Sequence, residues 1–145
     1  MHNIDVPAEG PDPDWRHRTA LLIGSQGLDR LAHARVIVVG LGGVGSYCAE
    51  ALARAGVGSL ILVDGDLVSV TNINRQLLAL VDTVGLPKAE VMADRIRRIN
   101  PDCDVVPMVM WVDRGNVDGL IASGPNSAQY VADAIDTIPA KLDLI

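Results

Sequence analysis

The sequence predicts an α/β fold in which one doubly wound, mainly parallel sheet carries helices on both faces. Short, continuous apolar runs alternate with amphipathic helical patterns from residue 35 onward, and each run stops at a glycine or an aspartate. Continuous apolar runs are typical of strands that are buried on both faces, as in parallel sheets. A glycine loop at residues 40–45 follows the first run, and such loops join a strand to a helix at phosphate-binding sites.

The N-terminal residues precede this alternation. Residues 1–14 are rich in proline and aspartate and show no period, so we expect a disordered arm. Residues 15–145 then form one nucleotide-binding domain, a length that suits a single domain. Within it, Gly27–Ala34 predicts a short helix before the first strand.

The first predicted strand and the helix after it flank the glycine loop in the sequence. Val36–Val39 predicts a buried strand, Val44–Ala55 a helix that Gly56 ends, and Leu60–Val63 a second buried strand that closes at Asp64. The apolar stripe of the helix is predicted to consist of Val44, Cys48, Ala51, Leu52 and Ala55.

A long loop and an edge strand follow. The loop at Gly65–Gly85 is longer than an ordinary connection, and such loops are often functional. Pro87–Asn100 predicts a helix that Pro101 stops. Val105–Val112 predicts a third strand, and its Pro107 lacks a ladder donor, which places the strand at an edge. The predicted buried face of the helix is Ala89, Met92, Ala93, Ile96 and Ile99.

The C-terminal part predicts one more helix and strand. Asp113–Ser123 predicts a helix capped by its aspartate, and Tyr130–Ile135 a fourth strand that ends at Asp136. A further helix begins at Pro139. Because Rossmann-like folds usually have about six strands, we expect a truncated domain whose C-terminal part is missing.

Composition narrows the function classes. The formal charge of −6 disfavours broad, charge-driven binding to nucleic acid, although a local basic patch could hold one RNA. The two cysteines form no metal-spaced pair, and a reducing cytoplasm is the natural location. Cys103 lies between two aspartates, whose charge raises a thiol pKa. No apolar run reaches membrane-spanning length, and no signal peptide is visible.

The glycine loop predicts a nucleotide site. Gly40 permits the tight turn, Gly42 lets backbone N–H groups approach phosphate, and Gly45 lets helix and strand pack closely. The positive end of the helix dipole adds to phosphate binding. The glycines do not decide which nucleotide binds.

The stretch after the second strand favours a triphosphate. Asp64 can accept hydrogen bonds from ribose hydroxyls, but NAD enzymes use an acid at the same position, so it does not tell ATP from NAD. Asp66 is as well explained by a solvated turn as by direct binding of the nucleotide. Arg75 and Lys88 distinguish a triphosphate site from a dinucleotide site, because positioned cations stabilise the negative charge that develops in phosphoryl transfer. Asn72 and Gln76 add further polar groups that suit a triphosphate.

These motifs resemble the ThiF/MoeB superfamily of adenylyltransferases, which is related to ubiquitin-activating enzymes. The resemblance implies that ATP adenylates a carboxylate and that pyrophosphate leaves. It implies that Asp136 holds Mg²⁺ and that Arg18 enters the partner's site in a homodimer. The residues that carry it are Gly40-Leu41-Gly42-Gly43-Val44-Gly45, Asp64-Gly65-Asp66, Thr71-Asn72-Ile73-Asn74-Arg75-Gln76, Lys88 and Asp133-Ala134-Ile135-Asp136. By the same resemblance, Asp64 would hold ribose, and the phosphates would bind Asn72, Arg75, Gln76 and Lys88.

Within the superfamily, the sequence is most similar to tRNA threonylcarbamoyladenosine dehydratases. R-T-A-L-L-I-G, T-N-I-N-R-Q and V-G-L-P-K-A-E-V-M-A-D-R-I-R-R-I-N-P carry this similarity. It implies a tRNA substrate and leaves room for a sulfur-transfer protein as a second partner. Residues 124–129 depart from the family's pattern. Three alternatives stay open: a sulfur-carrier adenylyltransferase for thiamine or molybdopterin synthesis, a NAD-binding oxidoreductase domain, and a non-catalytic nucleotide-binding fragment.

Overall fold

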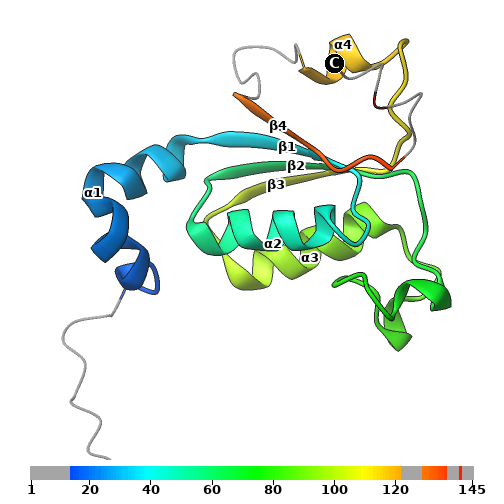
Figure 1. The fold of residues 1–145 in the computed structure, drawn as a ribbon, viewed down its shortest axis with the longest axis horizontal. Coiled ribbons are helices and arrows are strands. Elements are labelled where there is room, and N and C mark those ends of the chain that lie inside the picture. The colour runs from blue at the N-terminus through cyan, green and yellow to red at the C-terminus, as the bar shows by residue number, and fades with distance from the viewer. Residues whose placement is uncertain (1–13, 122–128, 137–140, 142–145) are drawn as a thin grey trace, which may run out of the picture.

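The sheet has four parallel strands and confirms the predicted α/β class (Figure 1). The structure, a computed structural model, describes residues 14–121, 129–136 and 141. Of the arm predicted at residues 1–14, residues 1–13 lie outside the described part, as does the helix predicted from Pro139 apart from Lys141. The strand order is β3-β2-β1-β4, with β1 at Arg35–Val39, β2 at Ser59–Val63, β3 at Asp104–Met108 and β4 at Tyr130–Asp133.

Helices cover both faces of the sheet. The helices α2, Gly45–Ala55, and α3, Lys88–Ile99, lie side by side on one face, and the short α4, Val117–Ile121, lies on the other (Figure 1). The larger apolar cluster is buried between the sheet and the two long helices, whereas Ile37, Val39 and Val63 pack towards α4. Among the described residues, no helix is both long enough and apolar enough to cross a membrane.

The edge position of β3 is confirmed, but the strand is shorter than predicted. Pro107 pairs in register with Leu62 of β2, and within the described part of the chain no strand pairs with the other side of β3. The strand ends at Met108 rather than at Val112, because the Met110 N–H bonds back to the Met108 carbonyl and turns the chain off the sheet. Likewise, α4 begins at Val117 rather than at Asp113, since the chain first turns through residues 113–116.

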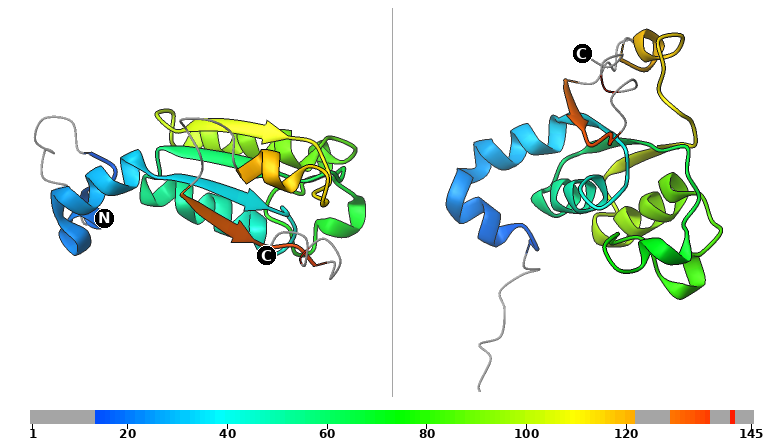
Figure 2. Two further views of the ribbon diagram at one scale, coloured as in Figure 1. Left: turned by 90° about the horizontal axis from the view of Figure 1, so that it is seen from above. Right: turned by 45° about the vertical axis from the view of Figure 1, so that its right-hand side comes forward.

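The helix α1, His17–His33, is longer than the predicted segment, and Gly24 (φ 70°) kinks it. It extends beyond the amino edge of the sheet (Figure 2). Its C-terminal end is fastened there, because the Gly58 N–H bonds to the Leu31 carbonyl at 3.0 Å. A Cβ on Gly58 would lie 1.8 Å from the carbonyl oxygen of Ala32, so only glycine allows this approach.

The predicted buried stripe of α2 was wrong at Val44 and Ala51, while its other three residues are half-buried and Leu52 packs against the core. The stripe of α3 was confirmed apart from its last residue, which is only half-buried. In α2 the side chain of Val44 is 74% exposed and Ala51 is also exposed. All the fully buried residues of α2 are small, and at Gly45 a Cβ would lie 1.7 Å from the Gly40 carbonyl oxygen. The buried residues of α2 are Gly45, Ser46, Ala49 and Ala53.

Candidate functional site

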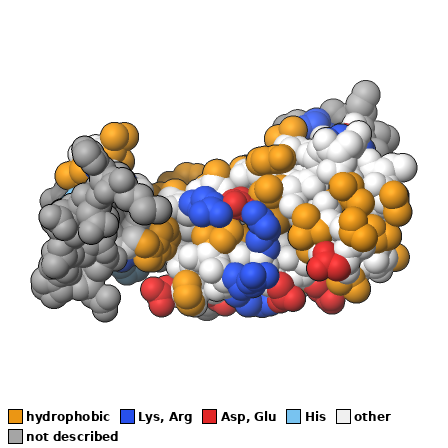
Figure 3. Space-filling model, turned by 90° about the horizontal axis from the view of Figure 1, so that it is seen from below, with side chains coloured by type: hydrophobic (Ala, Val, Ile, Leu, Met, Phe, Trp, Pro, Cys, Tyr) orange, Lys and Arg blue, Asp and Glu red, His pale blue; other side chains and the backbone are white. Residues whose placement is uncertain are grey.

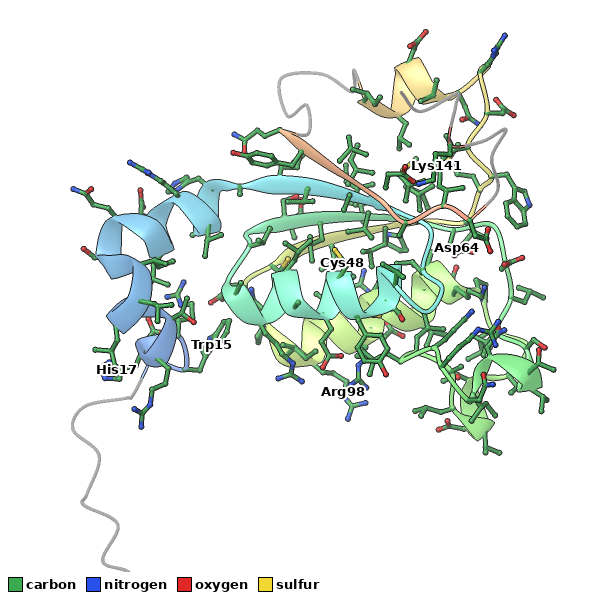
Figure 4. All side chains as sticks on the ribbon, in the orientation of Figure 1. Trp15, His17, Cys48, Asp64, Arg98 and Lys141 are labelled. Atoms are coloured by element: carbon green, nitrogen blue, oxygen red, sulfur yellow. The ribbon has the colours of Figure 1, made fainter. Side chains whose placement is uncertain are left out.

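A pocket lies at the carboxyl edge of the sheet, where the ends of all four strands meet. Figure 4 shows Asp64 at this edge, at the opposite end of the molecule from Trp15 and His17 of the α1 region. Seven of the predicted site residues line it together with apolar side chains. The lining consists of Val39, Gly40, Gly42, Val63, Asp64, Gly65, Asp66, Gln76, Lys88, Met110, Trp111, Val112, Ala134, Ile135 and Asp136.

The four glycines of the loop divide into two kinds. Gly40 (φ 88°) has a backbone conformation that side chains rarely adopt, and a Cβ on Gly45 would lie 1.7 Å from the Gly40 carbonyl oxygen. These two glycines are therefore needed for folding. Cβ atoms on Gly42 and Gly43 would meet nothing closer than 3.7 and 3.6 Å. Glycine at those two positions leaves bare backbone, which suits a phosphate cradle.

Asp64 joins the glycine loop to the end of β2. Its Oδ2 accepts the Leu41 N–H at 2.7 Å, and its Oδ1 accepts the Asp66 N–H at 2.8 Å. The residue is only 9% exposed. Each carboxylate oxygen can accept a second hydrogen bond, so Asp64 can order the loop and still bind ribose hydroxyls.

Lys88 and Asp66 form an ion pair in the pocket wall. The Lys88 Nζ lies 2.9 Å from the Asp66 Oδ2, with the lysine side chain 6% exposed and the aspartate side chain 49% exposed. The pair exists because the two stems of the long loop bond to each other: the Lys88 N–H donates to the Asp66 carbonyl and the Val68 N–H to the Leu86 carbonyl. Sequence spacing did not reveal this partnership.

Gln76 presents an unpaired polar atom. Its Oε1 is buried without a hydrogen-bond partner among the described residues. Ser46 holds the neighbouring backbone, since its Oγ donates to the Gly42 carbonyl at 2.6 Å and accepts the Leu77 N–H at 3.3 Å. A buried, unpaired amide beside a glycine loop fits a ligand that completes its hydrogen bonding. Because amide orientation is assigned by the surrounding network, either end of Gln76 can face that ligand.

The side chains of Asn72, Arg75 and Arg18 do not line the pocket. The Asn72 side chain accepts the Ser69 N–H at 2.9 Å and caps the short helix η1, Val70–Asn72. The Arg75 Nη1 donates to the Thr71 carbonyl at 2.9 Å, so its guanidinium turns outward although its backbone borders the glycine loop. Arg18 is exposed in the first turn of α1, outside this pocket.

Two aspartates lie at the carboxyl end of β4, with Asp133 as its last residue and Asp136 three residues further on. Asp136 lines the pocket, and one carboxylate together with substrate phosphates is a common way to hold Mg²⁺. The described residues contain no cluster of three or more His, Cys, Asp or Glu that could hold a metal on its own. The Oδ2 of Asp133 accepts the Lys141 Nζ at 2.5 Å. Partial burial raises the pKa of Asp133, but the hydrogen bonds from Lys141 and the Ile135 N–H outweigh burial and lower it overall.

The two cysteines are not placed for catalysis. Burial, and to a lesser degree Asp104, raises the pKa of Cys103 to about 11, which confirms the expected direction and adds burial as the larger cause. Cys48 is half-buried on α2.

Basic side chains over α2 and α3 lie among acidic ones (Figure 3). Glu50 bonds to both Arg54 and Arg95, and Arg97 pairs with Asp94 at 2.9 Å. The hydrogen bond from Arg95 is the main cause that lowers the pKa of Glu50. Two arginines of α3, Arg95 and Arg97, are therefore paired with acidic side chains.

Comparison with known proteins identifies the family. Residues 16–145 match the ThiF family. The chain is 52% identical over 134 residues to the tRNA threonylcarbamoyladenosine dehydratase of Escherichia coli, and this match covers 90% of the chain and 49% of the relative. It is 41% identical to the molybdopterin-synthase adenylyltransferase of Salmonella typhimurium, over 82% of the chain and 46% of the relative.

A solved structure agrees with this assignment. The crystal structure of the Escherichia coli dehydratase, TcdA, in complex with ATP superposes with a TM-score of 0.85 at 51% identity, covering 90% of this chain and 54% of that one. The chain spans about half the length of the curated relatives it matches. On the evidence of sequence, fold and glycine-loop pocket together, the chain belongs to the ThiF family.

Proposed function

We propose that this chain is the nucleotide-binding part of an ATP-dependent enzyme that dehydrates threonylcarbamoyladenosine in tRNA. The observation that carries the proposal is one pocket that combines a bare glycine loop, a buried acid and a buried lysine. The similarity to dehydratases, one of them solved with ATP, supports the choice of nucleotide and of substrate.

In the proposed reaction, a carboxylate oxygen of the substrate attacks the α-phosphorus of ATP and pyrophosphate leaves. The carbamoyl group then attacks the acyl carbon of the adenylate, AMP leaves and a ring closes with loss of one proton. The net change is removal of one water. Because the nucleophile belongs to the same molecule, high effective molarity can drive ring closure without a catalytic cysteine.

Each pocket residue is proposed to bind the part of ATP or its metal that its charge fits. Backbone N–H groups of Gly42 and Gly43 face the phosphates, and Asp64 receives the ribose. Lys88 exchanges Asp66 for a phosphate and stabilises the charge that develops at phosphorus, a contribution of several kcal/mol for a well-placed cation. Asp136 would hold the Mg²⁺ that accompanies ATP, and the metal would supply positive charge to the phosphates.

Other predicted residues require movement or a second copy. Gln76 completes its hydrogen bonds on a phosphate, and Asn72 and Arg75 join it only if the η1 segment rearranges. Arg18 lies outside the pocket of its own chain, so its proposed role requires a homodimer in which α1 reaches the partner's site. We propose that the enzyme acts in the cytoplasm, on tRNA.

The test is made in the source cells. The locus is deleted, tRNA is digested at mildly acidic pH to preserve a labile ring, and the nucleosides are analysed by mass spectrometry. We expect the cyclic nucleoside to be replaced by the open form, which is heavier by one water. Complementation with the intact locus restores the ring, whereas the same locus with Asp64→Ala does not. Persistence of the cyclic form after deletion contradicts the tRNA assignment.

A sulfur-carrier adenylyltransferase is the second candidate, favoured by the 41% identity to a molybdopterin-synthase adenylyltransferase. It predicts thiamine or molybdopterin auxotrophy in the deletion strain, with tRNA unchanged. A NAD-binding oxidoreductase domain predicts that the purified chain binds NAD more tightly than Mg-ATP, which the buried Lys88 disfavours. A non-catalytic fragment predicts nucleotide binding without either phenotype.

A further inference from the structure

We propose that Ser46 is a positioning residue for phosphate binding, because its hydroxyl holds Gln76 in register with the glycine loop. The inference rests on the proposed function, since it requires a phosphate-bearing nucleotide in the pocket. Ser46 itself does not line the pocket. It acts through the two segments that its hydroxyl joins, and it thereby adds a support that neither the glycines nor the charged side chains provide.

The hydroxyl of Ser46 connects the glycine loop to Leu77, which lies 31 residues further along the chain than Ser46. Ser46 belongs to the first turn of α2 and is 0% exposed. Its Oγ donates to the Gly42 carbonyl at 2.6 Å and accepts the Leu77 N–H at 3.3 Å. One hydroxyl therefore uses its donor on the loop and one acceptor site on the segment that carries Gln76.

Two donors fix the carbonyl of Gly42. The Ser46 N–H bonds to it at 3.1 Å in addition to the Oγ, so both lone pairs of the oxygen are occupied. In a planar trans peptide, the carbonyl and the N–H of the next residue point in opposite directions. The Gly43 N–H therefore points away from Ser46, and it has no hydrogen-bond partner among the described residues. That N–H can donate to a phosphate.

Gln76 lies over the same part of the loop. A Cβ built on Gly42 would be 3.7 Å from the Gln76 Nε2, and the Oε1 of that amide is buried and has no partner within the described part of the chain. Gln76 comes directly before Leu77, whose N–H bonds to Ser46. The bond to Leu77 thus determines where the Gln76 backbone lies relative to the loop, and with it the reach of the amide.

This register matters because hydrogen bonds weaken steeply as their geometry departs from the optimum. A phosphate that binds both the Gly43 N–H and the Gln76 amide requires the two groups to be correctly placed at the same time. Alanine at position 46 removes the Oγ bonds to Gly42 and to Leu77, while the backbone bond to Gly42 remains. The segment around Gln76 then loses its link to the loop although the loop keeps its turn.

The first experiment measures the affinity of the full chain for inorganic tripolyphosphate, Mg-ATP and adenosine. Ser46→Ala should weaken binding of the two phosphate ligands about fivefold, the scale for loss of one hydrogen bond. Binding of adenosine, which has no phosphate, should not change. Unchanged affinity for the phosphate ligands, or an equal loss for adenosine, overturns the inference and leaves the proposed function standing.

Ser59→Ala is the matched control. Ser59 is also buried, but it begins β2 at the opposite edge of the sheet, and its Oγ has no hydrogen-bond partner among the residues that the structure describes. The same substitution there should change none of the three affinities. A loss of phosphate binding in Ser59→Ala equal to that in Ser46→Ala contradicts a specific role for Ser46.

A double-mutant cycle with Gln76→Ala tests whether Ser46 acts through Gln76. In the Gln76→Ala background, Ser46→Ala should weaken tripolyphosphate binding less than about twofold, because the amide that Ser46 positions is then absent. Urea unfolding of the same four proteins provides the comparison. There Ser46→Ala should lower the free energy of unfolding equally in both backgrounds, since its bonds do not involve the Gln76 side chain. Additive effects on binding refute the proposal.

Hydrogen exchange of the wild-type chain tests the bridge without any variant. The Leu77 N–H should exchange more slowly than the Gly43 N–H, which has no partner in the described part of the chain, and tripolyphosphate should slow both. A Leu77 N–H that exchanges as fast as that of Gly43 refutes the bridge. If wild type binds neither Mg-ATP nor tripolyphosphate, the proposed function and this inference fail together.

Discussion

The ion pair between Lys88 and Asp66 predicts an asymmetric response to mutation. Removal of one partner from a fully buried pair costs about 3–5 kcal/mol, because the other charge is left unpaired away from water. Only the lysine is buried here, with 6% of its side chain exposed against 49% for the aspartate. Asp66→Asn leaves the buried Lys88 ammonium without a counter-charge, and nearby water compensates only in part. The substitution should therefore lower the free energy of unfolding by about 2 kcal/mol. Lys88→Met leaves a half-exposed carboxylate and should cost under about 1 kcal/mol.

Urea unfolding, followed by far-UV circular dichroism, measures both variants. Tripolyphosphate provides the second half of the test. It should stabilise Asp66→Asn more than wild type, because a phosphate then supplies the missing counter-charge without displacing Asp66. It should not stabilise Lys88→Met to a comparable degree. If Lys88→Met is the more destabilised variant, or if the anion stabilises all three proteins equally, Lys88 is a structural residue and is not held ready for a phosphate.

Three further predictions concern the loop, the α2–α3 contact and the buried thiol. Gly45→Ala should lower the free energy of unfolding, measured in urea, by more than about 3 kcal/mol, because its Cβ would lie 1.7 Å from a backbone oxygen and side-chain motion cannot relieve that overlap. Gly42→Ala should change the free energy of unfolding by about 1 kcal/mol or less but should weaken Mg-ATP binding. Glu50→Gln should lower stability by about 1 kcal/mol at pH 7. The difference from wild type should begin to shrink once pH falls to the ordinary pKa of glutamate and should disappear only below the lower pKa that Glu50 has in the folded state, because its stabilising charge is lost on protonation. A difference that stays constant from pH 7 down to the onset of acid unfolding contradicts this reasoning. Cys103, with its pKa raised to about 11, should resist iodoacetamide at pH 8 in the folded chain while Cys48 reacts faster, and equal rates by mass spectrometry would contradict it.

The success of sequence reasoning depended on how local each feature is. The apolar runs of β1 and β2 predicted their strands, and Pro107 predicted the edge, because burial on both faces and a missing donor are properties of single segments. The face of α2 was predicted only in part, because its fully buried residues are all small and include Gly45 and Ser46, which hydrophobic periodicity does not report. The structure also shows two contacts between distant segments, Lys88 with Asp66 and Ser46 with Leu77. No spacing rule connects those residues, so only the folded chain reveals them.

The paired stems of the long loop have a consequence for how this family can diversify. Because hydrogen bonds join residues 66–68 to residues 85–88, the chain between them starts and finishes at nearly one point. Lengthening a loop whose ends are already held together raises the entropic cost of loop closure by only about 0.6 kcal/mol for each doubling in length. Insertions or deletions between the stems could therefore change the outer surface, and with it partner choice, while Lys88 and Asp66 keep their places in the pocket.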